Sequence, residues 1–280
     1  MLSALSNSHD GHHLLHQRAS AKGVVTGRED GKVHLLLAAS GSVATIKLPE
    51  IVSALARHPN LSIRLVLTAS AARFLAGQTP EQPTLSRLAH LPNVDGLYTD
   101  EAEWSPAWKR GAPILHIELR KCIVPLPEPV PYGCLLSLED KVEVEQCNPL
   151  TQPGADLLVI APLSANTLAK ITNGLCDDLL SSIVRAWDTT GIVDGRGRRR
   201  ILVAPAMNTC MWRHPITGRQ LRVLEEEWGG AAEDGWFDVL RPIEKTLACG
   251  DTGDGAMKAW QDVVAEIERR LGFDAEVKSG

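Results

Sequence analysis

Three polar residues, His116, Asn208 and Cys249, have side chains that could bind and protonate a small anionic substrate. Asn208 follows the short apolar run 201–204. This run predicts a buried strand, which Pro205 ends because proline has no N–H group for a sheet. An amide at the carboxyl end of a parallel strand lies where ligands bind, and it can donate to a carboxylate while staying neutral. A turn or a helix cap is the alternative interpretation of Asn208.

His116 and Cys249 are candidates for proton transfer. His116 lies at the start of a predicted helix, and histidine suits a general base because its unperturbed pKa lies near neutrality. A lone histidine at such a position is more often structural. Cys249 is followed by glycines at 250, 253 and 255, which predict a tightly turned or mobile loop and an accessible thiol. An inert turn cysteine is the alternative.

Small polar turns follow three predicted buried strands, at 40–42, 68–70 and 164–167. Each precedes a predicted helix, and the free N–H groups and dipole of a helix N-terminus favour an anion such as a phosphate. Ordinary turns and helix caps are the alternatives. The Ser-Gly-Ser turn at 40–42 is not a GxGxxG dinucleotide fingerprint, so it does not by itself identify a cofactor.

The elements that must position these residues alternate between strand and helix. The pattern predicts an α/β fold with a doubly wound, mainly parallel sheet in a single domain. We expect a disordered tail at 1–30, the domain at 31–272 and a C-terminal tail at 273–280. Alternating prolines from Pro125 to Pro131 forbid a helix there and favour an extended loop. The insertion 123–154 that contains them is either a surface excursion or a gene-model artefact.

The composition excludes several classes of function. The 280 residues carry a net charge of −5, so there is no basic surplus for nucleic acid, and no apolar run reaches membrane-spanning length. The six cysteines form no CxxC pair and no signal peptide is visible, which predicts reduced thiols and a cytoplasmic protein. The histidines at 12, 13 and 16 lack partners at a site-like spacing, and we expect no metal.

Five motifs together resemble those of the flavin-dependent cysteine decarboxylases. The run Pro205–Trp212 is similar to their PxMNxxMW motif, and 41–47 is similar to GSVAxxK. The runs HIELR at 116–120, APLSANT at 161–167 and LACGDTGDGAM at 247–257 complete the resemblance, which covers most of 32–271 apart from 123–154 and 191–200. It implies a flavodoxin-like, Rossmann-like flavoprotein fold and a homotrimer with FMN sites near the subunit interfaces.

The resemblance also implies roles for individual residues. His116 would be the base, Asn208 would hold the substrate carboxylate and Cys249 would donate the final proton. Substrate contacts would also come from Met211, Ala248 and Gly250. The residues implied for FMN are Ser40, Gly41, Ser42, Thr68, Ser70, Ser164, Ala165, Asn166, Thr167 and Ala206.

The implied reaction is the FMN-dependent decarboxylation of 4'-phosphopantothenoyl-L-cysteine, a small-molecule substrate, to 4'-phosphopantetheine in coenzyme A biosynthesis. Direct loss of CO2 would leave an unstabilised carbanion. Oxidation of the thiol-bearing carbon by FMN gives a thioaldehyde, which accepts the electrons released with CO2 and becomes an enethiolate. Its reduction restores the flavin, so this carboxy-lyase needs no NAD.

Three other functions are compatible with parts of the pattern. A peptidyl-cysteine decarboxylase would share the flavin motifs but would stop at the enethiol and would not need Cys249. A flavin prenyltransferase of the same fold should lack the combination of His116, Asn208 and Cys249. A regulatory subunit that inhibits a phosphatase would typically carry a long acidic C-terminal tail, whereas this sequence ends at Gly280 without one.

Overall fold

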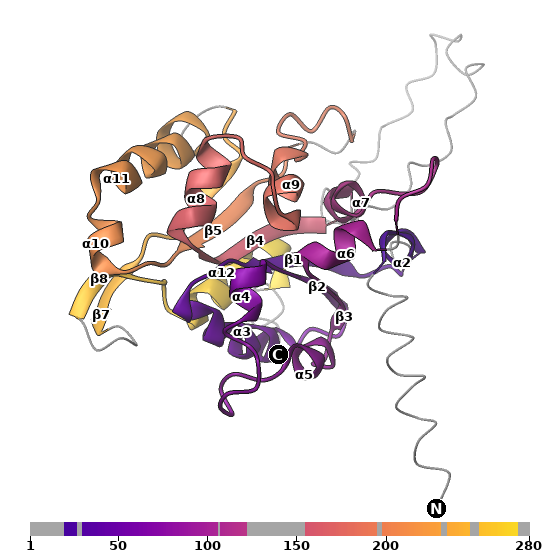
Figure 1. Ribbon diagram of the computed structural model, residues 1–280, viewed down its shortest axis with the longest axis horizontal. Helices are drawn as coiled ribbons and strands as arrows, with labels where there is room; N and C mark the ends of the chain where they lie inside the picture. The colour runs from indigo at the N-terminus through magenta and orange to yellow at the C-terminus, as the bar shows by residue number, and fades with distance from the viewer. Residues whose placement is uncertain are drawn as a thin grey trace, which may run out of the picture.

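The computed structural model describes residues 20–26, 30–105, 107–121, 155–194, 198–230, 234–246 and 252–273. In these residues the chain forms a six-stranded sheet, in the order β3-β2-β1-β4-β5-β6, and every pair of neighbours is parallel (Figure 1). Its strands are β1 (Val33–Ala39), β2 (Leu61–Leu67), β3 (Val94–Tyr98), β4 (Ala155–Leu163), β5 (Ile201–Pro205) and β6 (Phe237–Val239). An antiparallel hairpin, β7 (Ile243–Thr246) and β8 (Thr252–Ala256), packs beside the sheet. The predicted doubly wound α/β fold is therefore confirmed.

Helices cover both faces of the sheet (Figure 1). One face packs against α2 (Ala21–Thr26), α7 (Leu115–Lys121), α8 (Ala165–Thr172), α9 (Leu179–Arg185), α11 (Pro215–Arg222) and the π-helix η3 (Val223–Glu227). The other face packs against α3 (Leu48–Leu55), α4 (Ala69–Ala72), α5 (Leu85–Ala89) and α12 (Trp260–Leu271). The 3-10 helix η1 (Val43–Lys47) leads into α3, while α6 (Asp100–Trp104) and α10 (Thr209–Trp212) are short helices at the ends of strands.

Alternation along the strands explains why both faces need helices. In β1, Leu36 and Ala38 belong to the apolar cluster under α7 to α9, whereas Leu35 and Leu37 belong to the cluster under α3 and α12. Strands that are apolar on both faces occur in parallel sheets because crossover helices bury both sides. The strand order also reverses between β1 and β4, since the chain builds outward from β1 on both sides. A ligand site is expected at such a switch point.

Several details differ from the sequence expectation. Helix α2 lies inside the segment expected to be disordered, and its Val24 is fully buried, so that expectation was wrong for residues 21–26. Phe273, placed in the C-terminal tail, is buried and stacks on His58 at a centroid distance of 4.2 Å. The sequence analysis predicted no helix at α5. The segment 123–154 lies outside the described residues.

No helix in the described part of the chain is both long enough and apolar enough to cross a membrane.

Candidate functional site

A row of polar turns follows the carboxyl ends of β1 and β4, where the strand order reverses. The buried Ser40 joins the two ends, because its hydroxyl accepts from the N–H of Ser164 at 2.7 Å and donates to the carbonyl of Pro162 at 3.1 Å. Ala206, after β5, extends the row by donating its N–H to the carbonyl of Leu163 at 2.9 Å. These bonds bring residues from three distant stretches of sequence to one edge.

The turn after β2 lies at the other end of this row of turns. Thr68 caps α4 by accepting from the N–H of Ala71 at 3.2 Å, and its hydroxyl lies 3.2 Å from that of Ser70. A Cβ atom on Gly41 would collide with both the Cβ and the Oγ of Ser70. Glycine is therefore required at 41 for the turns after β1 and β2 to approach one another.

Three of the six predicted flavin-binding hydroxyls are engaged in local caps. Ser42 accepts from the N–H of Ala44 at 3.4 Å, and Ser164 accepts from that of Thr167 at 3.3 Å. The Thr167 side chain is buried, whereas Asn166 and Ser70 are exposed. The cap interpretation is thus confirmed at Ser42, Thr68 and Ser164. Because Ser164 caps the N–H of Thr167, the N–H groups of Ala165 and Asn166 in the first turn of α8 are the donors that remain for a ligand.

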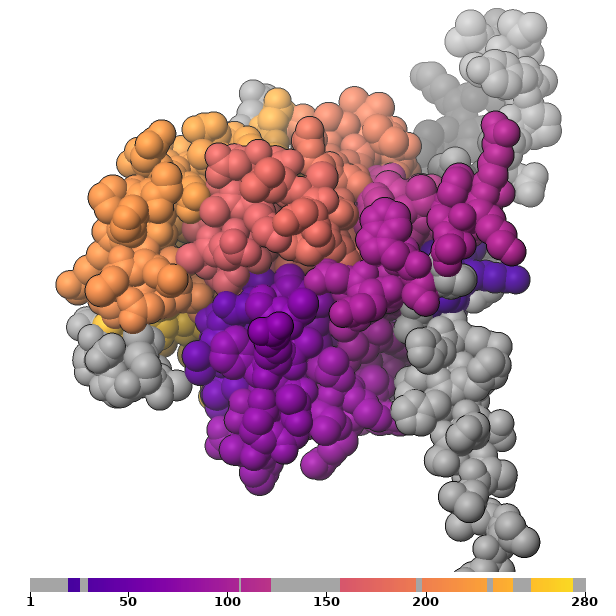
Figure 2. All heavy atoms as spheres, viewed as in Figure 1, coloured from indigo at the N-terminus to yellow at the C-terminus, as the bar shows by residue number. Residues whose placement is uncertain are grey.

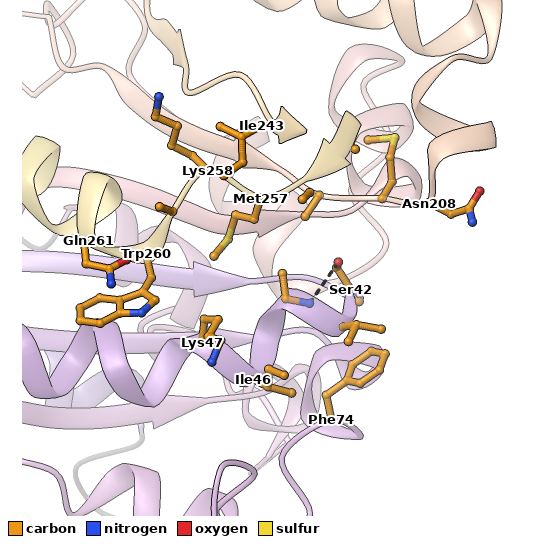
Figure 3. A pocket seen from close by; sticks show the side chains of 18 residues that line it. Ser42, Ile46, Lys47, Phe74, Asn208, Ile243, Met257, Lys258, Trp260 and Gln261 are labelled. Carbon is orange, nitrogen blue, oxygen red and sulfur yellow. Dashed lines mark hydrogen bonds between the residues drawn. The ribbon is translucent and has the colours of Figure 1, made fainter. Parts of the chain in front are cut away.

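A cavity of about 680 Å³ opens beside this row (Figure 3). It lies between the segment Gly41–Lys47, the stretch Ala206–Asn208 and the segment 255–261 that links β8 to α12. In Figure 3, Met257 and Trp260 reach across toward Ile46 and Lys47, and Asn208 lies at the rim. Four predicted site residues, Gly41, Ser42, Ala206 and Asn208, therefore line one cavity.

Asn208 is the N-cap of α10. Its Oδ1 accepts from the N–H of Cys210 at 2.8 Å, and the residue is exposed. The cap interpretation is correct, but it leaves the NH2 group of the same amide available as a donor. Asn208 can therefore cap the helix and bind an anion at once. The neighbouring Met211 is 54% exposed and does not line the cavity.

His116 lies in the first turn of α7, where the carboxylate of Glu103 contacts it twice. Glu103 Oε1 lies 2.6 Å from His116 Nδ1, and Oε2 accepts from the backbone N–H of His116 at 3.0 Å. The side chain of Glu103 is only 5% exposed, whereas that of His116 is 26% exposed. A histidine whose Nδ1–H donates to a carboxylate presents Nε2 as an acceptor, which suits a base.

The structure separates His116 from Asn208 within one chain. His116 does not line the cavity, and Figures 1 and 2 show α7 and the orange α10–α11 segment at well separated places, with α8 and α9 between them. Ala165 to Thr167 also lie outside the cavity lining, although Ser164 is tied to Ser40. Within this chain, His116 and Asn208 therefore do not belong to one cluster.

Ala248, Cys249 and Gly250 lie outside the described residues, but the strands that flank them are described. In β8, Gly255 accepts from the N–H of Met207 at 3.0 Å, and a Cβ on Gly253 would collide with the side chain of Thr209. Arg213 pairs with Asp254 at 3.2 Å. The hairpin that carries the cysteine motif is therefore docked on the stretch that carries Asn208.

Sequence reasoning did not predict that the segment 255–261 lines the cavity, and it missed Glu103. The glycines at 253 and 255 were a usable signal, because glycine in a strand often marks a close approach of another backbone. Nothing in the sequence distinguishes Glu103 from its acidic neighbours Asp100 and Glu101, since the contact with His116 is made only in the folded chain.

Helix α12 begins at the cavity with Trp260, and α3 follows the η1 residues that line it; the far ends of the two helices are joined. Glu268 of α12 accepts from Arg57, which follows α3, and lies 2.7 Å from His58 Nε2. Burial alone would raise the pKa of Glu268, but the bonds from Arg57 and His58 outweigh it and hold the pKa below its usual value. In the described part of the chain, no group of His, Cys, Asp and Glu is arranged to hold a metal ion.

Comparison with known proteins identifies the family. A family model for flavoproteins matches residues 24–126 and 137–272. Phosphopantothenoylcysteine decarboxylase from Arabidopsis thaliana is 41% identical over 226 residues, which are 81% of this chain and 79% of that protein. The chain belongs to the phosphopantothenoylcysteine decarboxylase family of flavoproteins.

Solved structures of this family share the fold. A decarboxylase variant complexed with pantothenoylaminoethenethiol is 38% identical, with a TM-score of 0.60 over 87% of this chain and 99% of that chain. The FMN-binding protein AtHal3 is also 38% identical, with a TM-score of 0.57 over 87% and 98% of the two chains. By contrast, this chain spans only 30% of a 36% identical Schizosaccharomyces pombe relative, named a probable thymidylate synthase.

Proposed function

We propose that this protein catalyses the FMN-dependent decarboxylation of 4'-phosphopantothenoyl-L-cysteine to 4'-phosphopantetheine, a cytoplasmic step of coenzyme A biosynthesis. The observation that carries the proposal is Asn208, a neutral donor that shares a cavity with the Gly41–Ser42 turn and Ala206. The family relatives named for this decarboxylation support it, and their names favour an enzyme over a regulatory subunit.

The polar edge fits the cofactor FMN. Its row of turns supplies helix N-termini for a phosphate, and Gly41 permits the close approach of two of those turns. The residues that would hold FMN are those of the turns 40–42, 68–70 and 164–167, with Ala206. When bound, FMN supplies a two-electron oxidation of the substrate and its later reversal.

Three residues of this chain would have separate roles in the reaction. The Asn208 amide is held in one orientation by the bond from Cys210, so its NH2 group can donate to the substrate carboxylate. His116 Nε2 would accept the proton that the substrate loses on oxidation. Cys249 would protonate the enethiolate that remains after CO2 leaves. Of these groups, only Cys249 is needed solely for the closing step.

The role of Cys249 has a direct test. A serine preserves the size of the side chain but is a far weaker acid than a thiol of pKa about 8.5. Under anaerobic conditions, Cys249→Ser should release CO2 for roughly one turnover per site and leave an enethiol two hydrogens short of the thiol product. Many turnovers to the saturated thiol would exclude Cys249 as the proton donor, and a failure to release any CO2 would place it earlier.

We infer in addition that the protein is a homotrimer whose sites take residues from two subunits. The separation of α7 from α10 within one chain supports this inference, since the reaction requires both His116 and Asn208. Apolar side chains are also exposed around α7, and they would be covered by a neighbour. They are Trp104, Trp108, Ile114, Ile192 and Val193.

Complementation tests the shared site. His116→Gln and Asn208→Asp should each be inactive as homo-oligomers, whereas subunits exchanged between the two variants should regain part of the wild-type activity. Native mass spectrometry would report the trimer and the exchange. Exchange without recovery of activity would show that each site is built from one subunit.

A further inference from the structure

The carboxylate of Glu103 contacts His116 at two places, the imidazole ring and the backbone N–H. One carboxylate oxygen contacts the ring nitrogen Nδ1 at 2.6 Å, and the other accepts from the backbone N–H at 3.0 Å. The carboxylate is 5% exposed, so water competes little for these oxygens. Both acceptors of a single side chain are therefore used to fix the orientation of one histidine.

We propose that Glu103 is the positioning residue that keeps His116 in the tautomer with hydrogen on Nδ1 and an open lone pair on Nε2. Its carboxylate offers only acceptors to the ring, so the neutral imidazole must place its hydrogen on Nδ1. The role of Nε2 as a base rests on the proposed function, whereas the tautomer rests on the contact itself.

Helix α6, which carries Glu103, is fixed to the same edge of the sheet. Asp100, one turn before Glu103, accepts from the N–H of Ala69 at 3.2 Å and from that of Leu179 at 3.0 Å. Ala69 belongs to the polar turn after β2, and Leu179 begins α9. In Figure 1, α6 lies between α4 and α7. The short helix α6 therefore links the position of His116 to the turn 68–70, one of the turns predicted to bind FMN.

A glutamine at position 103 should favour the other neutral tautomer of the His116 ring. Its amide has one acceptor and one NH2 donor group, so it cannot accept from both His116 N–H groups. The arrangement that satisfies both contacts keeps the amide oxygen on the backbone N–H and points NH2 at Nδ1. The ring hydrogen must then move to Nε2, which removes the lone pair that would accept the proton.

Nuclear magnetic resonance of histidine labelled with ¹⁵N reads the tautomer directly. The chain has nine histidines, and the His116 signals are those lost in His116→Gln. At a pH where the ring is neutral, we expect the wild type to carry hydrogen on Nδ1 and Glu103→Gln to carry it on Nε2. Glu103→Asp keeps two acceptors on a shorter side chain and should retain the wild-type tautomer in part.

The rate of anaerobic flavin reduction by substrate provides the second measurement. Glu103→Gln should slow it by about 10²- to 10⁴-fold, because a misplaced tautomer removes general base catalysis. Flavin absorbance should confirm that FMN remains bound. Glu103→Asp should recover part of the rate, and the exposed Glu101→Gln on the same helix is the matched control that should match the wild type.

These two measurements distinguish a failure of the positioning role from a failure of the proposed function. A wild-type ring with hydrogen on Nε2, or a Glu103→Gln protein with unchanged tautomer and rate, would overturn the positioning role. If the tautomer follows Glu103 but the wild type releases no CO2 from phosphopantothenoylcysteine, the hold on His116 stands and the proposed function fails. A Glu103→Gln change should also cost nothing further in the His116→Gln background if Glu103 acts through that ring.

Discussion

The β5–α10 stretch and the α6–α7 stretch orient their polar residues in different ways. Asn208 is oriented by a bond to Cys210, two residues along the chain. His116 is oriented by Glu103, which is 13 residues away and lies on a separate helix. The first arrangement follows from a strand, a proline and a cap, and the second exists only once two helices have packed together.

Because of this difference, the orientations of Asn208 and His116 depend on different parts of the fold. Asn208 should keep its orientation wherever the local backbone is intact, because its partner belongs to the same turn. His116 should lose its orientation when α6 moves, even if α7 remains helical. Three substitutions can therefore test the comparison. One changes a charge within a turn, one disturbs a contact between two turns, and one weakens a contact between two helices.

The largest expected effect comes from Asn208→Asp. Aspartate is also a good N-cap, so α10 should be retained. A hydrogen bond to a charged group, worth about 1.5–3 kcal/mol, is replaced by repulsion between two carboxylates. We expect turnover to fall by about 10²-fold or more, with FMN still bound.

The matched control for this change is Asn173→Asp, which alters an exposed asparagine at the end of α8. It should leave turnover unchanged. Turnover close to that of the wild type in Asn208→Asp would show that the amide does not hold a carboxylate.

A smaller effect is expected from Gly41→Ala, which tests a contact between two turns. The added methyl group would collide with the Cβ of Ser70 and force the turns after β1 and β2 apart. Strain of about 1–3 kcal/mol is typical of such overpacking. We expect the dissociation constant of FMN, measured by quenching of flavin fluorescence, to rise by about 10-fold or more.

Two comparisons make the result specific. Ser70→Gly should restore part of the FMN affinity in the Gly41→Ala background, because it removes the atoms in collision. Gly218→Ala in α11 meets no atom within 4 Å and should leave FMN affinity unchanged. An unaltered affinity in Gly41→Ala would show that the approach of these turns is not needed for the flavin.

The smallest effect is expected from Glu268→Gln, which tests a contact between helices far from the site. The pKa of Glu268 is held below the ordinary value of 4.5, so its charge contributes stability above that pH. This contribution is lost as the pH falls through the lower folded pKa. We expect the variant to lose about 1 kcal/mol of unfolding free energy at pH 7, a modest value because the Arg57 partner is largely exposed.

Urea unfolding at several pH values would measure this contribution. The difference between the wild type and Glu268→Gln should shrink as the pH falls below about 4.5. A difference that stays constant with pH would mean that the charge of Glu268 does not stabilise the contact between α12 and the end of α3.

Local chemistry explains how much the sequence could predict. The strands β1, β4 and β5 and the caps at Ser42, Thr68 and Ser164 follow from runs of apolar residues and from hydroxyls at strand ends. The contacts Glu103–His116 and Gly41–Ser70 could not be predicted, because they join separate elements. Helix α2 was missed for a related reason, since its short sequence is stabilised by packing against α7.

The most direct test of the proposed decarboxylation is an anaerobic reaction of the FMN-loaded wild-type protein with phosphopantothenoylcysteine, with flavin absorbance and CO2 release recorded together. We expect the flavin absorbance to fall and recover in each turnover while CO2 and the saturated phosphopantetheine thiol form in equal amounts. A flavin that stays oxidised, with no CO2 released although substrate binds, would contradict the proposed function.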